Sequence, residues 1–286
     1  DRDPGAAIAG DDGAGIAHLA AGFAVERRLI GQHDYRIALP GRLHFGAVLD
    51  DGDNLGRMIA EAAQNQGTPL IEGDILVVTQ KIVSKAEGML VSLDTVIPSQ
   101  FAREYAENAD RDPRLIELVL RESKSIVRMD QDRGVLITET KHGFICANAG
   151  IDQSNIPDED VVCLLPIDPD ASARRISAEI NAVTGVAPPI IISDTFGRAW
   201  REGHVNFAIG VAGMDPLKDY RGTDDANGRI LHVTTIAVAD ELAATAEMIT
   251  AKAINVPVAL IRGMPYQPDV GSTASLLRDR TRDMFR

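Results

Sequence analysis

The sequence predicts an α+β fold in which mixed sheets, flanked by helices, form two intertwined lobes. Two continuous apolar runs, residues 75–79 and 189–193, are typical of strands buried on both faces. Two strand-like segments on either side of residues 141–143 predict a hairpin. Amphipathic stretches separate these strands, and we find no repeat or Gly/Ser linker in the 286 residues. A second lobe is therefore expected to be interwoven with the first.

Turn and capping residues delimit the elements of the first half. Asp50 to Asn54 offer a turn and an N-cap, Gly73-Asp74 precede an apolar run, and Pro113 stands where a helix tolerates proline in its first turn. The expected elements are a strand within residues 25–39, a helix over 55–63, a strand over 75–79, and helices over 98–108 and 113–122.

The second half alternates strands with two long helices. Its expected elements are hairpin strands over 135–140 and 144–147, a strand over 161–166, a helix over 168–183, a buried strand over 189–193 that ends at an aspartate motif, a strand or helix start over 231–235, a helix over 236–253, and a last strand over 258–263.

Composition limits the classes of partner. The formal net charge is −13 and only 4% of residues are aromatic, which argues against nucleic acid and an anionic membrane as partners. No stretch approaches the roughly 20 apolar residues that cross a bilayer, and the first 22 residues lack the pattern of a signal peptide, so we expect a cytoplasmic protein. Cys146 and Cys163 lie among apolar neighbours and are expected to be reduced, buried thiols.

Several common catalytic motifs are missing from the sequence. It contains no GxxxxGK[ST] phosphate loop, no GxGxxG after a strand, no HExxH zinc motif and no GxSxG nucleophile elbow. The common nucleotide-binding folds, zinc hydrolases and serine acyltransferases are therefore not indicated.

Two aspartates follow apolar strands and point to a hard divalent cation. Asp152 lies in residues 147–155, Ala-Asn-Ala-Gly-Ile-Asp-Gln-Ser-Asn, and Asp194 lies in residues 193–198, Ser-Asp-Thr-Phe-Gly-Arg. Two carboxylates at one point repel, a divalent cation removes that repulsion, and Thr195 adds a hydroxyl ligand. The alternative is structural: Asp194-Thr195 as a helix cap and Asp152 as an Asx-turn.

Basic side chains beside these motifs suit an anionic ligand. Lys81 and Lys85 follow the buried strand over 75–79, and ligands of α/β sheets gather at the carboxyl ends of strands. Arg198 and Arg201 could hold a second anionic group. The alternatives are two solvated lysines and two arginines that flank Trp200 in a packed loop.

Taken in order, these motifs resemble the coenzyme F-420-0:L-glutamate ligase family, also called gamma-glutamyl ligase. The resemblance runs from about Leu39 to Gly263 and includes residues 77–88, 137–140, 142–144, 147–155, 165–170 and 194–198. It implies a gamma-glutamyl ligase-like fold over residues 35–286, preceded by an extension over residues 1–34. It also implies the single-domain form, without the flavin-binding nitroreductase domain fused to some actinobacterial relatives.

The resemblance implies a GTP-dependent ligase that adds L-glutamate to the deazaflavin precursor coenzyme F-420-0, with later glutamates joined through gamma linkages. GTP would phosphorylate the precursor's carboxylate, and the glutamate amine would displace phosphate. Manganese or magnesium, potassium as a further cation and a homodimer are also implied. By motif, the metal ligands would be Asp152, Asp194 and Thr195, the catalytic residues Asp152, Asp194 and Lys85, and the nucleotide contacts Gln80, Lys81, Lys85, Asn155 and Arg198.

Two departures from the family pattern keep alternatives open. The early turn reads Leu39-Pro40-Gly41-Arg42, with an insertion before the acidic residues that follow, and Ala251-Lys252 replace a Gly-Gln metal-binding element. One alternative is a related nucleotide-dependent ligase acting on a different acceptor or amino acid. Another is a nucleotide-binding or scaffolding protein without turnover.

Overall fold

The computed structural model describes residues 49–154, 158–250 and 256–284. The expected extension over residues 1–34, the strand within residues 25–39 and the altered early turn lie outside these ranges, as do Ala251 and Lys252. The boundary at residue 35 stays a prediction.

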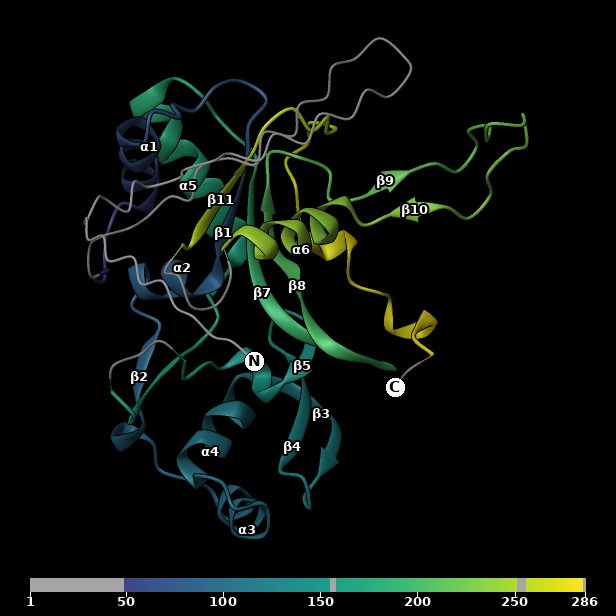
Figure 1. The fold of residues 1–286 in the computed structure, drawn as a ribbon. Helices are drawn as coiled ribbons and strands as arrows, with labels where there is room; N and C mark the ends of the chain where they lie inside the picture. The colour runs from purple at the N-terminus through teal and green to yellow at the C-terminus, as the bar shows by residue number, and fades with distance from the viewer. Residues whose placement is uncertain (1–48, 155–157, 251–255, 285–286) are drawn as a thin grey trace, which may run out of the picture.

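A mixed four-stranded sheet lies at the centre of the molecule (Figure 1). Its strands, in the order β11-β1-β7-β8, are Val258–Ile261, Ile75–Thr79, Ile190–Arg198 and Arg201–Ala212. Strands β1 and β7 are parallel, whereas β11 and β8 pair antiparallel with β1 and β7. The sheet is therefore mixed, as the sequence predicted, and the carboxyl ends of β1 and β7 lie at the same edge.

Helices cover both faces of this sheet (Figure 1). Helices α1 (Leu55–Asn65), α2 (Gln80–Ala86) and α5 (Pro169–Thr184) share one core cluster with Ile190 and Ile192. Helix α6 (Val238–Thr250) packs with Ile191 on the opposite face. Because side chains alternate along a strand, this division of the core fixes the face of each residue of β7.

The second lobe is inserted in the chain between α2 and α5, so the lobes are intertwined as predicted. It lies beyond the end of the central sheet in Figure 1 and contains one three-stranded sheet, one two-stranded sheet and a helix pair. Its elements are β2 (Leu90–Ser92), α3 (Gln100–Ala109), α4 (Pro113–Arg121), β3 (Ser123–Asp130), β4 (Val135–Thr140), β5 (Ile145–Ala147) and β6 (Val161–Cys163).

The remaining elements are short. Strands β9 (Lys218–Asp219) and β10 (Thr235–Ile236) form an arm that projects from the central sheet (Figure 1). The 3₁₀ turns are η1 (Leu93–Thr95), η2 (Asn148–Gly150), η3 (Thr273–Ser275) and η4 (Arg280–Arg282). Within the described ranges, no helix is both long and apolar enough to span a membrane. Both cysteines are free and buried, which confirms their prediction.

The strand over 189–193 was predicted too short, and its partner was missed. Strand β7 continues through Asp194 to Arg198, so Asp194 and Thr195 lie in a ladder and not in a helix cap. Strand β8 escaped prediction because its first four residues are exposed and polar whereas its last five are buried. A strand that changes from exposed to buried shows neither a continuous apolar run nor a clean alternation.

Candidate functional site

Lys81 and Asp152 meet at the carboxyl end of β1. Lys81 is the second residue of α2, which begins directly after this strand. Its ammonium group lies 2.8 Å from Asp152 Oδ2 and donates to the backbone and hydroxyl oxygens of Ser154 at 2.8 and 2.7 Å. Three oxygen partners hold the lysine head in place, so it is a fixed positive charge and not a solvated surface lysine.

The carboxylate of Asp152 is partly buried and already anchored. Its backbone pairs with Cys163 in an isolated bridge, and its Oδ1 accepts the Ser154 amide at 2.6 Å in an Asx-turn. Burial raises the pKa of Asp152, but the hydrogen bond from Lys81 and those from Ser154 outweigh burial and hold it below its usual value. A carboxylate accepts about four hydrogen bonds, so Asp152 can still accept a further ligand.

The turn that delivers Asp152 is left-handed over three successive residues. Asn148, Ala149 and Gly150 have φ angles of +52°, +54° and +72°. Non-glycine residues rarely adopt this conformation, and such strain clusters at functional sites. A Cβ on Gly150 would lie 3.0 Å from Leu165, so glycine is required there for space as well as for conformation.

Asp194 lies on the face of β7 that carries Ile192 and Phe196, toward α2 and β5. Burial raises the pKa of the Cys146 thiol on β5 to about 12, and the negative charge of Asp194 adds to that shift. The Gly150 amide donates to the same sulfur, two residues before Asp152. Strand β5 therefore carries a cysteine close to Asp194, and the turn after β5 leads directly to Asp152.

Thr195 faces the opposite side of β7, toward α6. Its hydroxyl donates to Oδ1 of the buried Asn206 at 2.7 Å, and the two residues are directly paired across the β7–β8 ladder. Adjacent residues of a strand point in opposite directions, so Asp194 and Thr195 present their oxygens on different faces.

The remaining predicted residues occupy different surroundings. Gln80 is buried, and its amide donates to Ser84 Oγ and to the Leu164 carbonyl at 2.8 and 3.0 Å. Lys85 is half-buried one helical turn after Lys81 and so lies on the same face of α2. Arg198 donates to the Glu202 carbonyl at 2.9 Å near the end of the β7–β8 hairpin. Asn155 lies outside the described residues.

The donor set fits a hard divalent cation in its chemistry. Two carboxylates and a hydroxyl are oxygen ligands of the kind that magnesium and manganese prefer. Asp194 and Thr195 face opposite sides of β7. This geometry suits two ions, one on each side, better than a single ion bound by both residues. Among the described residues, however, no three His, Cys, Asp or Glu side chains gather as a metal-binding group.

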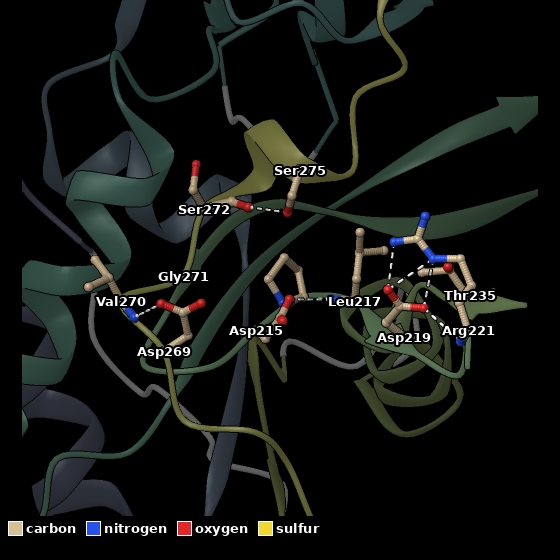
Figure 2. A pocket seen from close by; sticks show the side chains of 11 residues that line it. Asp215, Leu217, Asp219, Arg221, Thr235, Asp269, Val270, Gly271, Ser272 and Ser275 are labelled. Atoms are coloured by element: carbon tan, nitrogen blue, oxygen red, sulfur yellow. Dashed lines mark hydrogen bonds and ion pairs between the residues drawn. The ribbon is translucent and has the colours of Figure 1, made fainter. Parts of the chain in front are cut away.

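A separate cavity of about 470 Å³ lies at the base of the β9–β10 arm and contains none of the predicted site residues (Figure 2). Its polar groups are engaged with one another: Arg221 Nε donates to Asp219 Oδ1 at 2.9 Å, and the Leu217 amide donates to Asp215 Oδ1 at the same distance. We therefore place the candidate site at Lys81, Asp152 and Asp194 and not in this cavity.

Comparisons with known proteins show the family that the motifs resemble. The family model described as F420-0:Gamma-glutamyl ligase matches residues 46–263. The chain belongs to this family. It is 45% identical over 239 residues to the coenzyme F420:L-glutamate ligase of Methanothermobacter thermautotrophicus, covering 82% of this chain and 93% of that protein. The proteins of the same name from Methanopyrus kandleri and Methanocaldococcus jannaschii are 43% and 41% identical, covering 82% of this chain and 92% and 90% of theirs.

Two residues of the site were not predicted from the sequence of this gamma-glutamyl ligase family member. Ser154 bonds both Lys81 and Asp152, and Asn206 bonds Thr195. An Asp-x-Ser spacing indicates an Asx-turn, so Ser154 could have been found from the motif. Asn206 gave no such signal, because its role depends on the register between two strands.

Proposed function

We propose that this protein is a GTP-dependent ligase that joins L-glutamate to the deazaflavin precursor coenzyme F-420-0. The observation that carries the proposal is family membership, with 41–45% identity over about four fifths of the chain to proteins named coenzyme F420:L-glutamate ligase. The ion pair of Lys81 with Asp152 beside a strand end supports it, because phosphoryl transfer needs fixed charge around the reacting group.

The reaction has two steps. A carboxylate oxygen of the precursor attacks the γ-phosphorus of GTP, the bond between the γ-phosphorus and the β–γ bridging oxygen breaks, and GDP leaves with the electron pair. The α-amine of glutamate then attacks the acyl carbon, phosphate leaves, and the amine loses a proton as the amide forms. The products are glutamylated precursor, GDP and phosphate. Further glutamates would be added through gamma linkages.

The residues near Asp152 would perform the positioning in this scheme. Lys85 would hold a phosphate oxygen, and Lys81, on the same face of α2, would exchange one of its three protein oxygen partners for another. Asp152 and Asp194 would hold one divalent cation and Thr195 a second, and these ions would neutralise charge on the transferred phosphoryl group. Gln80, Asn155 and Arg198 would contact the nucleotide. Manganese or magnesium, with potassium as a further cation, a cytoplasmic location and a homodimer are parts of the same proposal.

The test is a mass-spectrometric assay of the purified protein with the precursor, L-glutamate, GTP and manganese. We expect products heavier by one or more glutamate residues, together with GDP. The Asp194→Asn variant should lose both products. Asp269→Asn is the matched control, because this exposed aspartate lines the separate cavity and its Oδ1 accepts the neighbouring Val270 amide.

Three other outcomes of this assay would favour a different function. A mass addition that differs from glutamate would favour a related ligase with another amino acid. GTP turnover that needs a different carboxylate would favour another acceptor. Nucleotide binding with no turnover under any of these conditions would refute the ligase proposal.

A further inference from the structure

The β7–β8 ladder contains a β-bulge just before the candidate site. Ile192 pairs with Gly210, but the next residue, Ser193, pairs with Ala208. Ile209 is therefore an extra residue on β8 with no partner on β7. A bulge of this kind shifts the register by one residue for the rest of the hairpin.

The shift decides which side chains accompany the two site residues of β7. In the observed register Thr195 lies opposite Asn206, and Asp194 lies opposite Phe207. Without the extra residue, Thr195 would lie opposite Phe207 and Asp194 opposite Ala208. Directly opposed residues share a face, so loss of the bulge would take Asn206 away from Thr195.

The packing of buried side chains on β8 shows that the bulge changes which face each residue points to. On β8, Ala208 and Val211 both pack on the α6 side, although they are three residues apart. A regular strand would place residues an odd number apart on opposite faces. Buried side chains on both faces of the sheet therefore depend on the bulge. Packing, as well as hydrogen bonding, sets the register between β7 and β8.

Asp240 in the first turn of α6 holds this bulge. Its Oδ1 accepts the backbone amide of Ala208, the neighbour of Ile209, at 2.9 Å. The bond crosses from helix to strand at the point where the ladder is interrupted. A buried amide left without an acceptor costs about 1–3 kcal/mol, so the carboxylate removes a penalty that would otherwise oppose the bulge.

The bulge in turn fixes the hydroxyl of Thr195. That hydroxyl donates its one proton to Oδ1 of Asn206 at 2.7 Å, and the Asn206 side chain is only 6% exposed. A hydroxyl whose proton is committed to one acceptor is held in one orientation. An oxygen held in one orientation is a suitable ligand for a hard cation.

We propose that Asp240 and Asn206 are positioning residues for Thr195: Asp240 holds the bulge that brings Asn206 into place, and Asn206 aims the Thr195 hydroxyl at a divalent cation. This inference rests on the proposed function in so far as Thr195 is a metal ligand. Partners behind a ligand of this kind typically change metal affinity about 10- to 100-fold.

The test is a titration of the full protein with manganese in the absence of substrates. Electron paramagnetic resonance measures the concentration of free manganese at each step, which gives the affinity. Asn206→Leu removes the acceptor at Thr195, and Asp240→Ala removes the acceptor at Ala208. Both should weaken manganese binding about ten-fold or more. Asp240→Asn keeps a carbonyl oxygen that can accept the Ala208 amide, so we expect its affinity to stay within about three-fold of the parent.

A matched control separates positioning from general stability. Asp170, at the start of α5, also accepts a β8 amide, that of Val211, at 2.8 Å. Asp170→Ala should lower the melting temperature and leave manganese affinity unchanged. Melting temperatures are measured for every variant, and Asn206→Leu and Asp240→Asn decide the question if Asp240→Ala does not fold.

Failure of this inference can be told from failure of the proposed function. Glutamylation by the parent protein together with parent-like manganese binding by Asn206→Leu and Asp240→Ala would overturn the inference alone. So would a loss of affinity in Asp240→Asn equal to that in Asp240→Ala, or an equal loss in Asp170→Ala. Weaker manganese binding in the two variants, with no glutamylation by the parent, would support the inference and refute the ligase. A parent protein that binds no manganese overturns both.

Discussion

Replacing Lys81 by methionine should destabilise the protein through the carboxylate it leaves behind. The lysine head is bonded to Asp152 and to two oxygens of Ser154, and the two charged side chains are 18% and 31% exposed. Exposed ion pairs contribute about 0.2–1 kcal/mol, and breaking a fully buried pair costs about 3–5 kcal/mol. This pair lies between these limits, so we expect a loss of about 2 kcal/mol near pH 7.

The pH dependence of that loss follows from the lowered pKa of Asp152. A carboxyl group whose pKa is depressed in the folded state contributes stability that is complete above its unfolded value of about 4 and disappears as the pH falls through the folded value. The difference between the parent and Lys81→Met should therefore be constant from about pH 5 to 8. It should shrink below about pH 4.

The assay is thermal and urea unfolding at several pH values, with the double variant Lys81→Met/Asp152→Asn. A loss of about 2 kcal/mol corresponds to roughly 4–8 °C in melting temperature. Lys141→Met is the control, because Lys141 pairs with Glu122 at 2.9 Å but is 56% exposed, and it should cost under about 1 kcal/mol. A melting temperature within about 1 °C of the parent, or additive effects in the double variant, would refute the reasoning.

Three further predictions concern packing and the buried thiol. Gly56→Ala should cost about 1–3 kcal/mol in urea unfolding, because its Cβ would clash with Glu179 Cβ where α1 packs against α5. Gly150→Ala should cost about 1–2 kcal/mol and reduce turnover, since it combines a φ of +72° with contact against Leu165; unchanged melting and turnover would contradict this. Cys146, with a pKa of about 12, should resist iodoacetamide at pH 8 in the folded protein and react in urea, as peptide mass spectrometry would show.

Much of the central sheet was predictable from the sequence because two of its strands begin with continuous apolar residues. Strands β1 and β7 begin with unbroken apolar residues, and these runs predict buried strands whatever surrounds them. Helix α2 was missed because it is only seven residues long, too short for a helical period to show. The first lobe's edge strand β8 was missed because its two halves face different environments.

The candidate site was predictable to the extent that it depends on local sequence. The Asx-turn of Asp152 and the lysine at the end of β1 follow from spacing along the chain. The ion pair between Lys81 and Asp152 joins residues that are far apart in sequence, so it depends on how the second lobe folds back onto α2. The pairing of Thr195 with Asn206 depends on one unpaired residue in β8, which no periodicity in the sequence reveals.

The strain at residues 148–150 lies where the site needs a fixed carboxylate. A left-handed non-glycine residue costs about 1–2 kcal/mol, and Asn148 and Ala149 both adopt this conformation. Ala149 is buried in the core of the second lobe, so packing there holds the strained turn. The turn then passes directly into the bridge between Asp152 and Cys163, which fixes the backbone of the aspartate from its other side. Core packing thus offsets the strain and leaves the Asp152 carboxylate with little freedom to move away from Lys81, as a site that must hold charge in one position requires.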